Sequence, residues 1–126
     1  PSHTVYEDDE VYAFLDVNPL AKGHTLVIPK GHHERVRDLP GDAAAALGAA
    51  VARVSPAVED AVDAPASTIA YNNGREAGQE IDHVHAHVVP RWDDDGAGSF
   101  HSLFRSIEEL DDDEMAALAD GIGSAV

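Results

Sequence analysis

Three histidines alternate with small apolar residues in the segment His83-Val84-His85-Ala86-His87. Residues two apart on a β-strand share a face, so a strand over residues 83–89, ending at Pro90, would align the three imidazoles about 6.6 Å apart. An imidazole has an unperturbed pKa near 6.5 and is mostly neutral at pH 7. One of its nitrogens can therefore attack phosphorus while the other is held by a hydrogen bond.

Three kinds of chemistry are compatible with such a row. A half-buried strand could simply carry its histidines on a solvated face. A zinc ion could use two of them with ligands from elsewhere, because a third imidazole about 13 Å along the same strand cannot converge on the same ion. An extended anion, such as a polyphosphate or phosphodiester, fits a linear array best, and protonated neighbours would stabilise charge on its oxygens.

The surrounding sequence predicts the elements that hold this row. Apolar residues recur every three or four positions between residues 47 and 62, which predicts a long amphipathic helix with Asp42 as its N-cap. Pro56 lacks a backbone N–H and should bend this helix or divide it near Ser55. Similar spacing near Asp111 predicts a C-terminal helix. Short runs of β-branched and aromatic residues predict strands at residues 4–6, 11–15, 25–28 and 67–71, in addition to residues 83–89.

These elements predict an α+β fold: a five-stranded antiparallel sheet, one long helix that is bent or divided, and a C-terminal helix. The sequence shows no internal repeat and no sign of a second domain. We therefore expect a single domain over residues 1–126.

Composition narrows the range of partners. The 126 residues include 8 Lys and Arg against 24 Asp and Glu, a formal charge of −16, which excludes nucleic-acid binding through a basic surface. This charge predicts a halophilic source, because molar salt shortens the screening length from about 10 Å to about 3 Å. No apolar run approaches the roughly 20 residues that span a bilayer, so we expect a cytoplasmic protein without a membrane partner. The sequence has no cysteine for a disulfide or a thiolate site.

Residues 72–91, with an Ala-Gly-Gln loop before His-x-His-x-His and apolar residues after it, resemble the signature of the histidine triad family. The segments Phe14–Pro19 and Gly23–Lys30, followed by His32, resemble the other shared blocks of that family. The resemblance covers residues 5 to about 91. It implies an enzyme that cleaves nucleoside phosphoramidates or dinucleoside polyphosphates through a covalent nucleotidyl-histidine intermediate, without a metal or another cofactor.

The resemblance also implies a role for each matched residue. His85 matches the nucleophile, His87 the histidine that contacts phosphoryl oxygens, and His83 the histidine whose backbone carbonyl holds the His85 ring. Gln79 matches a phosphate-contacting glutamine. The residues that match substrate-binding positions are Asp16 (ribose hydroxyls), His24 (a fourth histidine lining the site), Asn72 (near the phosphates) and Asn18.

The family further implies a homodimer and a nucleotide substrate, for which we expect a purine base. Glu80 stands where many eukaryotic relatives have Ser or Thr beside the leaving group. Some relatives bind structural zinc through a Cys-x-x-Cys pair with histidines that match His32 and His83, and this sequence lacks those cysteines. Two alternatives stay open: a nucleotide-binding or signalling module in which His85 is chemically idle, and a metal-dependent hydrolase that uses the histidines as ligands.

Overall fold

The computed structural model describes residues 2–126 as two compact units. The first unit ends at Gly96, and the second runs from Ala97 to Val126. The expectation of one domain over the whole chain stays a prediction.

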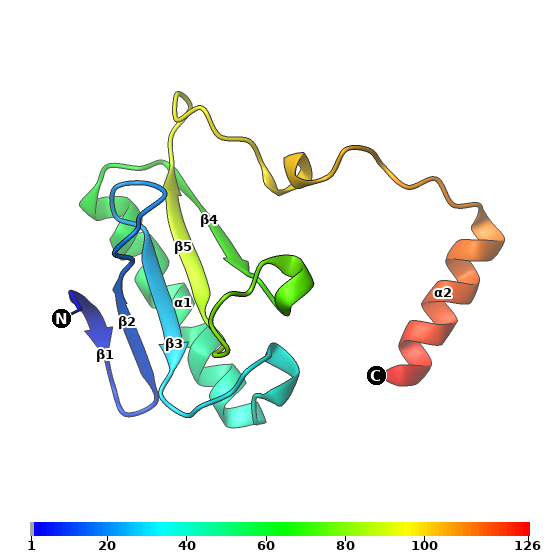
Figure 1. Ribbon diagram of the computed structural model, residues 1–126, viewed down its shortest axis with the longest axis horizontal. Coiled ribbons are helices and arrows are strands. Elements are labelled where there is room, and N and C mark those ends of the chain that lie inside the picture. The colour runs from blue at the N-terminus through cyan, green and yellow to red at the C-terminus, as the bar shows by residue number, and fades with distance from the viewer. Residues whose placement is uncertain (1) are drawn as a thin grey trace. The chain divides into compact units, whose positions relative to one another are not determined.

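The first unit contains a five-stranded antiparallel sheet, as predicted (Figure 1). Strand order across the sheet is β1-β2-β3-β5-β4, so β3 and β5 are neighbours although a helix and a strand separate them in sequence. Leu26 of β3 pairs with His87 of β5 in this ladder. The strands are β1 (Thr4–Glu7), β2 (Val11–Leu15), β3 (Thr25–Pro29), β4 (Ala66–Tyr71) and β5 (Ala86–Arg91).

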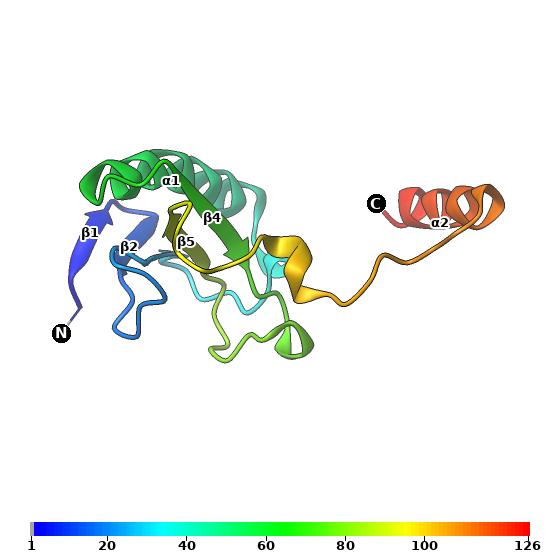
Figure 2. The ribbon, with the colours of Figure 1, turned by 90° about the horizontal axis from the view of Figure 1, so that it is seen from above.

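Helix α1 (Gly41–Ala61) runs along one face of this sheet (Figure 2). Its residues Leu47, Val54 and Val58 are buried, as their helical spacing predicts. Alternate residues of β5 face the helix, because side chains on a strand point to opposite faces in turn. The buried core consists of Val11, Ala13, Val27, Leu47, Ala50, Val54, Val58, Val84, Ala86 and Val88.

One prediction about α1 is wrong, and one of the two outcomes predicted at Pro56 is excluded. The helix begins at Gly41 with Pro40 as its N-cap, so Asp42 lies in the first turn, where its carboxylate suits the positive end of the helix dipole. One continuous helix passes through Pro56, so it is not divided near Ser55. An internal proline costs roughly 3 kcal/mol through a lost hydrogen bond and a clash. Burial of Val54 and Val58 against the sheet, on either side of Pro56, offsets that cost.

The position of β5 also corrects the sequence analysis. The strand begins at Ala86 and continues through Pro90 to Arg91, so His83 and His85 precede it. Pro29, at the end of β3, has no backbone N–H with which to extend the ladder towards His83. The segment before β5 is instead held by its neighbours, since the Val84 amide donates to the carbonyl of His33 at 2.7 Å.

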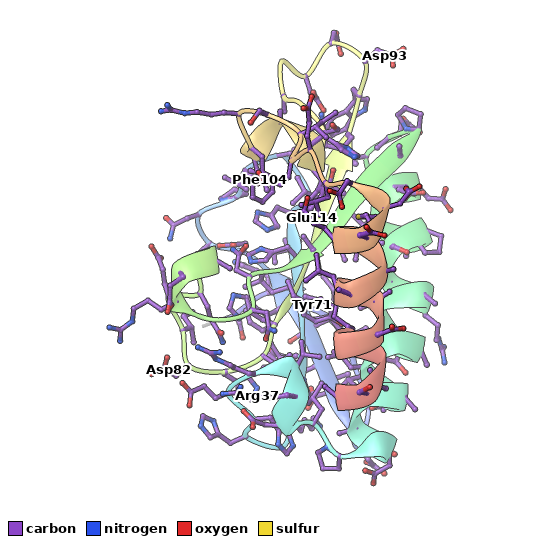
Figure 3. The ribbon with its side chains drawn as sticks, turned by 90° about the vertical axis from the view of Figure 1, so that its right-hand side faces the viewer. Arg37, Tyr71, Asp82, Asp93, Phe104 and Glu114 are labelled. Atoms are coloured by element: carbon purple, nitrogen blue, oxygen red, sulfur yellow. The ribbon has the colours of Figure 1, made fainter. Side chains whose placement is uncertain are left out.

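Three short 3-10 helices occur outside the sheet. They are η1 (Val36–Asp38), η2 (Arg75–Ala77) and η3 (Phe100–Leu103). Arg37 marks η1 in Figure 3, Tyr71 marks the end of β4, and Asp82 marks the loop that leads to β5.

The second unit contains η3 and helix α2 (Asp112–Ala125). A capping box starts α2: the Glu114 amide donates to the Asp111 carboxylate at 2.8 Å, and the Asp111 amide donates to the Glu114 carboxylate. The predicted C-terminal helix near Asp111 is thereby confirmed. Within residues 2–126, neither helix has the length and apolar character needed to cross a bilayer.

Candidate active site

A cavity of about 620 Å³ brings together six of the eight residues singled out from the sequence. Asp16, Asn18, His24, Asn72, His85 and His87 line it, whereas His83 and Gln79 do not. This volume lies in the range typical of small-ligand sites. Its wall also includes Ser2, Phe14, Leu15, Val17, Leu20, Leu26, Gly78, Glu80 and Ile81.

A second cavity of the same volume lies beside the β1–β2 turn and α1. Asp8, Asp9, Glu10 and Asp42 line it, and it contains no histidine. The Arg53 guanidinium there lies 5.2 Å from the centre of the Tyr6 ring. With one cation among four carboxylates, this cavity is not suited to an anion.

His85 is held by its own backbone neighbourhood. Its Nδ1 lies 2.7 Å from the carbonyl oxygen of His83. A carbonyl only accepts, so Nδ1 carries the proton and the lone pair of a neutral His85 is on Nε2. The hydrogen bond expected from the family resemblance is therefore present. It orients a nitrogen nucleophile in the wall of the cavity.

The side chain of His83 is turned to different partners. Its Nε2 lies 3.0 Å from the carbonyl oxygen of Pro29, and its Nδ1 lies 3.3 Å from Nδ1 of His32. The predicted straight row of three imidazoles is therefore wrong. His83 and His85 precede β5, so the alternation of a strand does not govern where their side chains point.

Three imidazoles gather at the cavity: His87 lies in β5, His85 in the segment before β5, and His24 in the loop before β3. The ring centres of His85 and His87 are 5.0 Å apart, and those of His24 and His87 are 5.2 Å apart. His24 immediately precedes β3, and the pairing of Leu26 with His87 brings it beside β5. Sheet pairing thus replaces the linear array by a compact cluster.

Hydrogen bonds connect this cluster to the loop before β3. The Leu20 amide donates to Nδ1 of His24 at 3.1 Å, and Nε2 of His24 lies 3.0 Å from Nδ1 of His87. His24 is 2% exposed, and burial lowers its pKa, although the nearby Asp16 carboxylate acts in the opposite direction. Burial also lowers the pKa of His87, with smaller contributions in the same direction from His85 and His24. Both rings therefore favour the neutral form at pH 7 more than a free imidazole does.

Asp16 closes the other side of the cluster. One carboxylate oxygen accepts the Asn18 amide at 2.9 Å, and the other lies 3.7 Å from Nε2 of His24. The Asp16 amide donates to the His24 carbonyl at 3.0 Å, which joins the two ends of the loop. Each carboxylate oxygen has two acceptor positions, so Asp16 retains acceptor capacity for hydroxyl groups of a ligand.

Gln79 is buried beneath the loop that follows β4. Its side-chain oxygen accepts the Gly74 amide at 2.8 Å. Its nitrogen donates to the carbonyls of Glu34 at 2.7 Å and Ile81 at 3.0 Å. An amide has two N–H donors, so neither is left for a phosphate oxygen in this structure. Gln79 instead fixes the shape of the loop that carries Asn72 and Gly78.

Asp16, His24 and His87 could also hold a cation by distance alone. Their candidate ligand atoms lie within 4.8 Å of one another, the one such group found in residues 2–126. A metal on Nε2 of His24 would require the proton of a neutral ring to be on Nδ1, directed at the Leu20 N–H. The donor set therefore fits a metal poorly while that hydrogen bond is intact.

The sequence did not predict the apolar part of the cavity wall or the hydrogen bond from the Leu20 amide to His24. Val17, Leu20 and Ile81 line the cavity and are 75%, 79% and 61% exposed. The sequence did contain a signal for these residues, because they are large apolar side chains in predicted turn and loop segments. Surface loops are usually polar. The Leu20 amide left no signal, since every non-proline residue has one.

Known proteins resemble this chain in sequence and in structure. A family model described as the HIT domain matches residues 1–94. The crystal structure of SMU.412c from Streptococcus mutans UA159 matches with a TM-score of 0.87 at 36% identity, covering 99% of this chain and 77% of that one. Adenylylsulfatase HINT3 of Arabidopsis thaliana is 38% identical over 111 residues, which are 88% of this chain and 56% of the relative.

A second named enzyme also matches. Adenosine 5'-monophosphoramidase HNT1 of Saccharomyces cerevisiae is 36% identical over 94 residues, which are 75% of this chain and 57% of the relative. The chain thus spans little more than half the length of these two enzymes. The family match includes the sheet, α1 and the cavity residues between Asp16 and His87. This chain belongs to the histidine triad (HIT) family.

Proposed function

We propose that this chain is a nucleotide hydrolase or nucleotidyl transferase that acts on nucleoside phosphoramidates or dinucleoside polyphosphates. The observation that carries the proposal is the 2.7 Å contact between Nδ1 of His85 and the His83 carbonyl, which leaves the Nε2 lone pair free. In the first step, Nε2 of His85 forms a bond to the α-phosphorus, and the bond from phosphorus to the leaving group breaks. The leaving group departs with its electron pair and takes up a proton from solvent. In the second step, water attacks the phosphorus and releases a proton to solvent, the N–P bond breaks and returns its electron pair to Nε2 of His85, and the nucleoside monophosphate leaves.

The cavity wall supports a nucleoside as the group transferred. Asp16 offers carboxylate oxygens to the vicinal hydroxyls of a ribose. The exposed apolar side chains of Val17, Leu20 and Ile81 offer a surface for a flat base, which we propose to be a purine. Burial of these side chains by the base would contribute roughly 25 cal/mol per Å² of apolar area.

Anion binding must be local, because the chain carries a formal charge of −16. Nε2 of His87 is buried and has no hydrogen-bond partner in the part of the chain that the structure describes. Because the atom is buried, contact with a phosphoryl oxygen requires a local rearrangement of the cavity wall. If this nitrogen carries the proton, it can donate to the phosphoryl oxygens and stabilise the charge that develops on them.

The names of the two relatives support the same class of substrate. Adenylylsulfatase and adenosine 5'-monophosphoramidase both refer to an adenosine monophosphate group joined to a second group. Nucleoside phosphosulfates are therefore included among the substrates that we propose to test. We also propose that the reaction needs no metal, given the proton position on His24.

Trapping of the intermediate tests this proposal. The protein is mixed with adenosine phosphoramidate, with diadenosine polyphosphates or with adenylyl sulfate in high salt, quenched within one turnover and analysed by peptide mass spectrometry. We expect a nucleotide monophosphate adduct on His85, and His85→Ala serves as the control. Nucleotide binding without an adduct or turnover would instead indicate a binding module. Turnover that a chelator abolishes would indicate a metal-dependent hydrolase.

A further inference from the structure

A chain of hydrogen bonds leads from the backbone of the loop before β3 into the cavity. It begins at the Leu20 amide, 3.1 Å from Nδ1 of His24. A backbone N–H can only donate, so Nδ1 of His24 must hold a lone pair. A neutral imidazole has one N–H, and in His24 it is therefore on Nε2.

The second link transfers this constraint to His87. Nε2 of His24 lies 3.0 Å from Nδ1 of His87, and because Nε2 carries the proton, Nδ1 of His87 accepts it. The single proton of a neutral His87 is consequently on Nε2. This is the buried nitrogen that has no partner among residues 2–126. A buried N–H without a partner is unfavourable, and a ligand oxygen would supply the missing acceptor.

Burial preserves this arrangement at neutral pH. The pKa values of both rings are lowered, so neither gains a second proton near pH 7. Protonation of His24 would also direct a new N–H on Nδ1 against the Leu20 N–H. The Asp16 carboxylate, 3.7 Å from Nε2 of His24, favours a proton on that nitrogen.

We propose that His24 is a positioning residue that sets the tautomer of His87. The Leu20 amide fixes the tautomer of His24, because a backbone N–H can only donate. In that tautomer His87 presents an N–H to the phosphoryl oxygen, while His85 presents a lone pair to phosphorus. The two neighbouring imidazoles thus have opposite tautomers, each fixed by the backbone. The catalytic consequence rests on the proposed function, since the acceptor is the phosphoryl oxygen of that substrate.

Nitrogen NMR of the free protein tests the tautomers without any substrate. With 15N-labelled histidine at pH 8, we expect the His87 proton on Nε2. We also expect the proton between the two rings to be bonded to Nε2 of His24, with a scalar coupling across the hydrogen bond to Nδ1 of His87. A wild-type His87 with its proton on Nδ1 would overturn the proposal. Since this measurement needs no turnover, its failure is distinct from a failure to detect the nucleotide adduct.

Two double variants, whose side chains at residue 24 match each other in shape, then test the link between the His87 tautomer and catalysis. Asp16→Asn/His24→Gln retains an N–H donor towards His87, whereas Asp16→Asn/His24→Glu offers a carboxylate that only accepts. Replacing Asp16 in both removes the neighbouring carboxylate that would raise the pKa of the new glutamate, and measurement at pH 8 counters the effect of burial in the same direction. We expect the glutamate variant to move the His87 proton to Nδ1 and the glutamine variant to keep it on Nε2.

The rates should follow the tautomers. Relative to Asp16→Asn alone, we expect kcat to fall about 10²–10³-fold with glutamate, as when one transition-state donor is lost, and less than about 10-fold with glutamine. Equal kcat values for two variants with different tautomers would refute the catalytic part, and equal tautomers would refute the positioning part. If the glutamate variant does not fold, the wild-type spectrum still tests whether the His87 proton is on Nε2.

Discussion

The Val84 amide donates a 2.7 Å hydrogen bond to the carbonyl of His33. This contact joins the segment before β5 to the segment after β3, at the point where Pro29 ends the sheet ladder. It allows His83 to face Pro29 and His32 while His85 faces the cavity. Because this segment is not a strand, His83 and His85 do not share a face. The His83 side chain contacts the backbone at Pro29, and His85 is left as the candidate nucleophile.

Replacing the candidate nucleophile should abolish turnover. In His85→Ala we expect kcat to fall at least about 10⁴-fold, as when a nucleophile is removed from a hydrolase, while nucleotide binding persists. No other imidazole that lines the cavity in the described part of the chain supplies a free lone pair, because His87 directs an N–H and the lone pair of His24 accepts the Leu20 amide. His87→Ala should cost only about 10²–10³-fold. Steady-state kinetics and calorimetric binding of adenosine monophosphate measure both effects. Near-full turnover by His85→Ala would rule out the covalent mechanism.

Stability should depend on pH through His24. Its folded pKa lies below the unfolded value of about 6.5, so the unfolded chain binds more protons once the pH falls below that value. The contribution of His24 is therefore fully present above about pH 6.5 and is lost as the pH falls towards the folded pKa. We expect the free energy of unfolding of wild type minus that of His24→Gln to decrease between pH 7.5 and 5.5 in urea titrations. The exposed His101→Gln is the control, and a constant difference for His24→Gln would contradict the expectation.

The loop beneath the cavity should not tolerate a side chain at Gly74. This residue has a φ of 101°, and a Cβ there would lie 3.1 Å from the guanidinium carbon of Arg35. Gly74→Ala should destabilise the fold by about 1–3 kcal/mol, because alanine is strained at this φ. We also expect kcat to fall, because the Gly74 amide donates to the side-chain oxygen of Gln79, which shapes the loop beneath the cavity. Gly48→Ala, on α1 with no atom within 4 Å of the new Cβ, should instead stabilise by about 0.5–1 kcal/mol. Thermal melts of both variants provide the comparison.

Salt should stabilise the protein. With a formal charge of −16, lowering KCl from 1 M to 0.1 M lengthens the screening distance from about 3 Å to about 10 Å and increases repulsion among carboxylates. We expect Tm to fall over this range. Sucrose at equal osmolality controls for solvent exclusion and should not replace KCl. A constant Tm would argue against adaptation to high salt.

We expect a homodimer through the β4 edge. β4 ends the sheet, its sequence ASTIAY has no charge, and Ile69 and Tyr71 are 45% and 40% exposed. Uncharged edge strands pair readily with another chain. Light scattering should give twice 13.3 kDa, and Ile69→Lys should give a monomer, with Ile107→Lys as the control. A single 13.3 kDa species from wild type at micromolar concentration would be evidence against the dimer.

The sequence by itself determined the order of the main elements and the family. Its period-2 and period-3.6 patterns predicted the five-stranded sheet and both helices, because alternate burial is a property of each local segment. The run His83–His87 pointed to phosphoryl chemistry, and the resemblance around it assigned the family. The N-cap of α1 was not predicted, and of the two outcomes predicted at Pro56 the division of the helix is wrong, since packing against the sheet outweighs local preference.

Tertiary structure decided which imidazoles meet. Asp16, His24 and His87 converge only because β3 pairs with β5 across sixty residues of intervening chain. The tautomers of His85 and His87 depend on the His83 carbonyl and the Leu20 amide, backbone groups that the residue types do not distinguish. Gln79 acquires its partners because the loop folds over it. Hydrogen bonds between distant segments need fixed positions within a few tenths of an ångström, and only the folded chain supplies them.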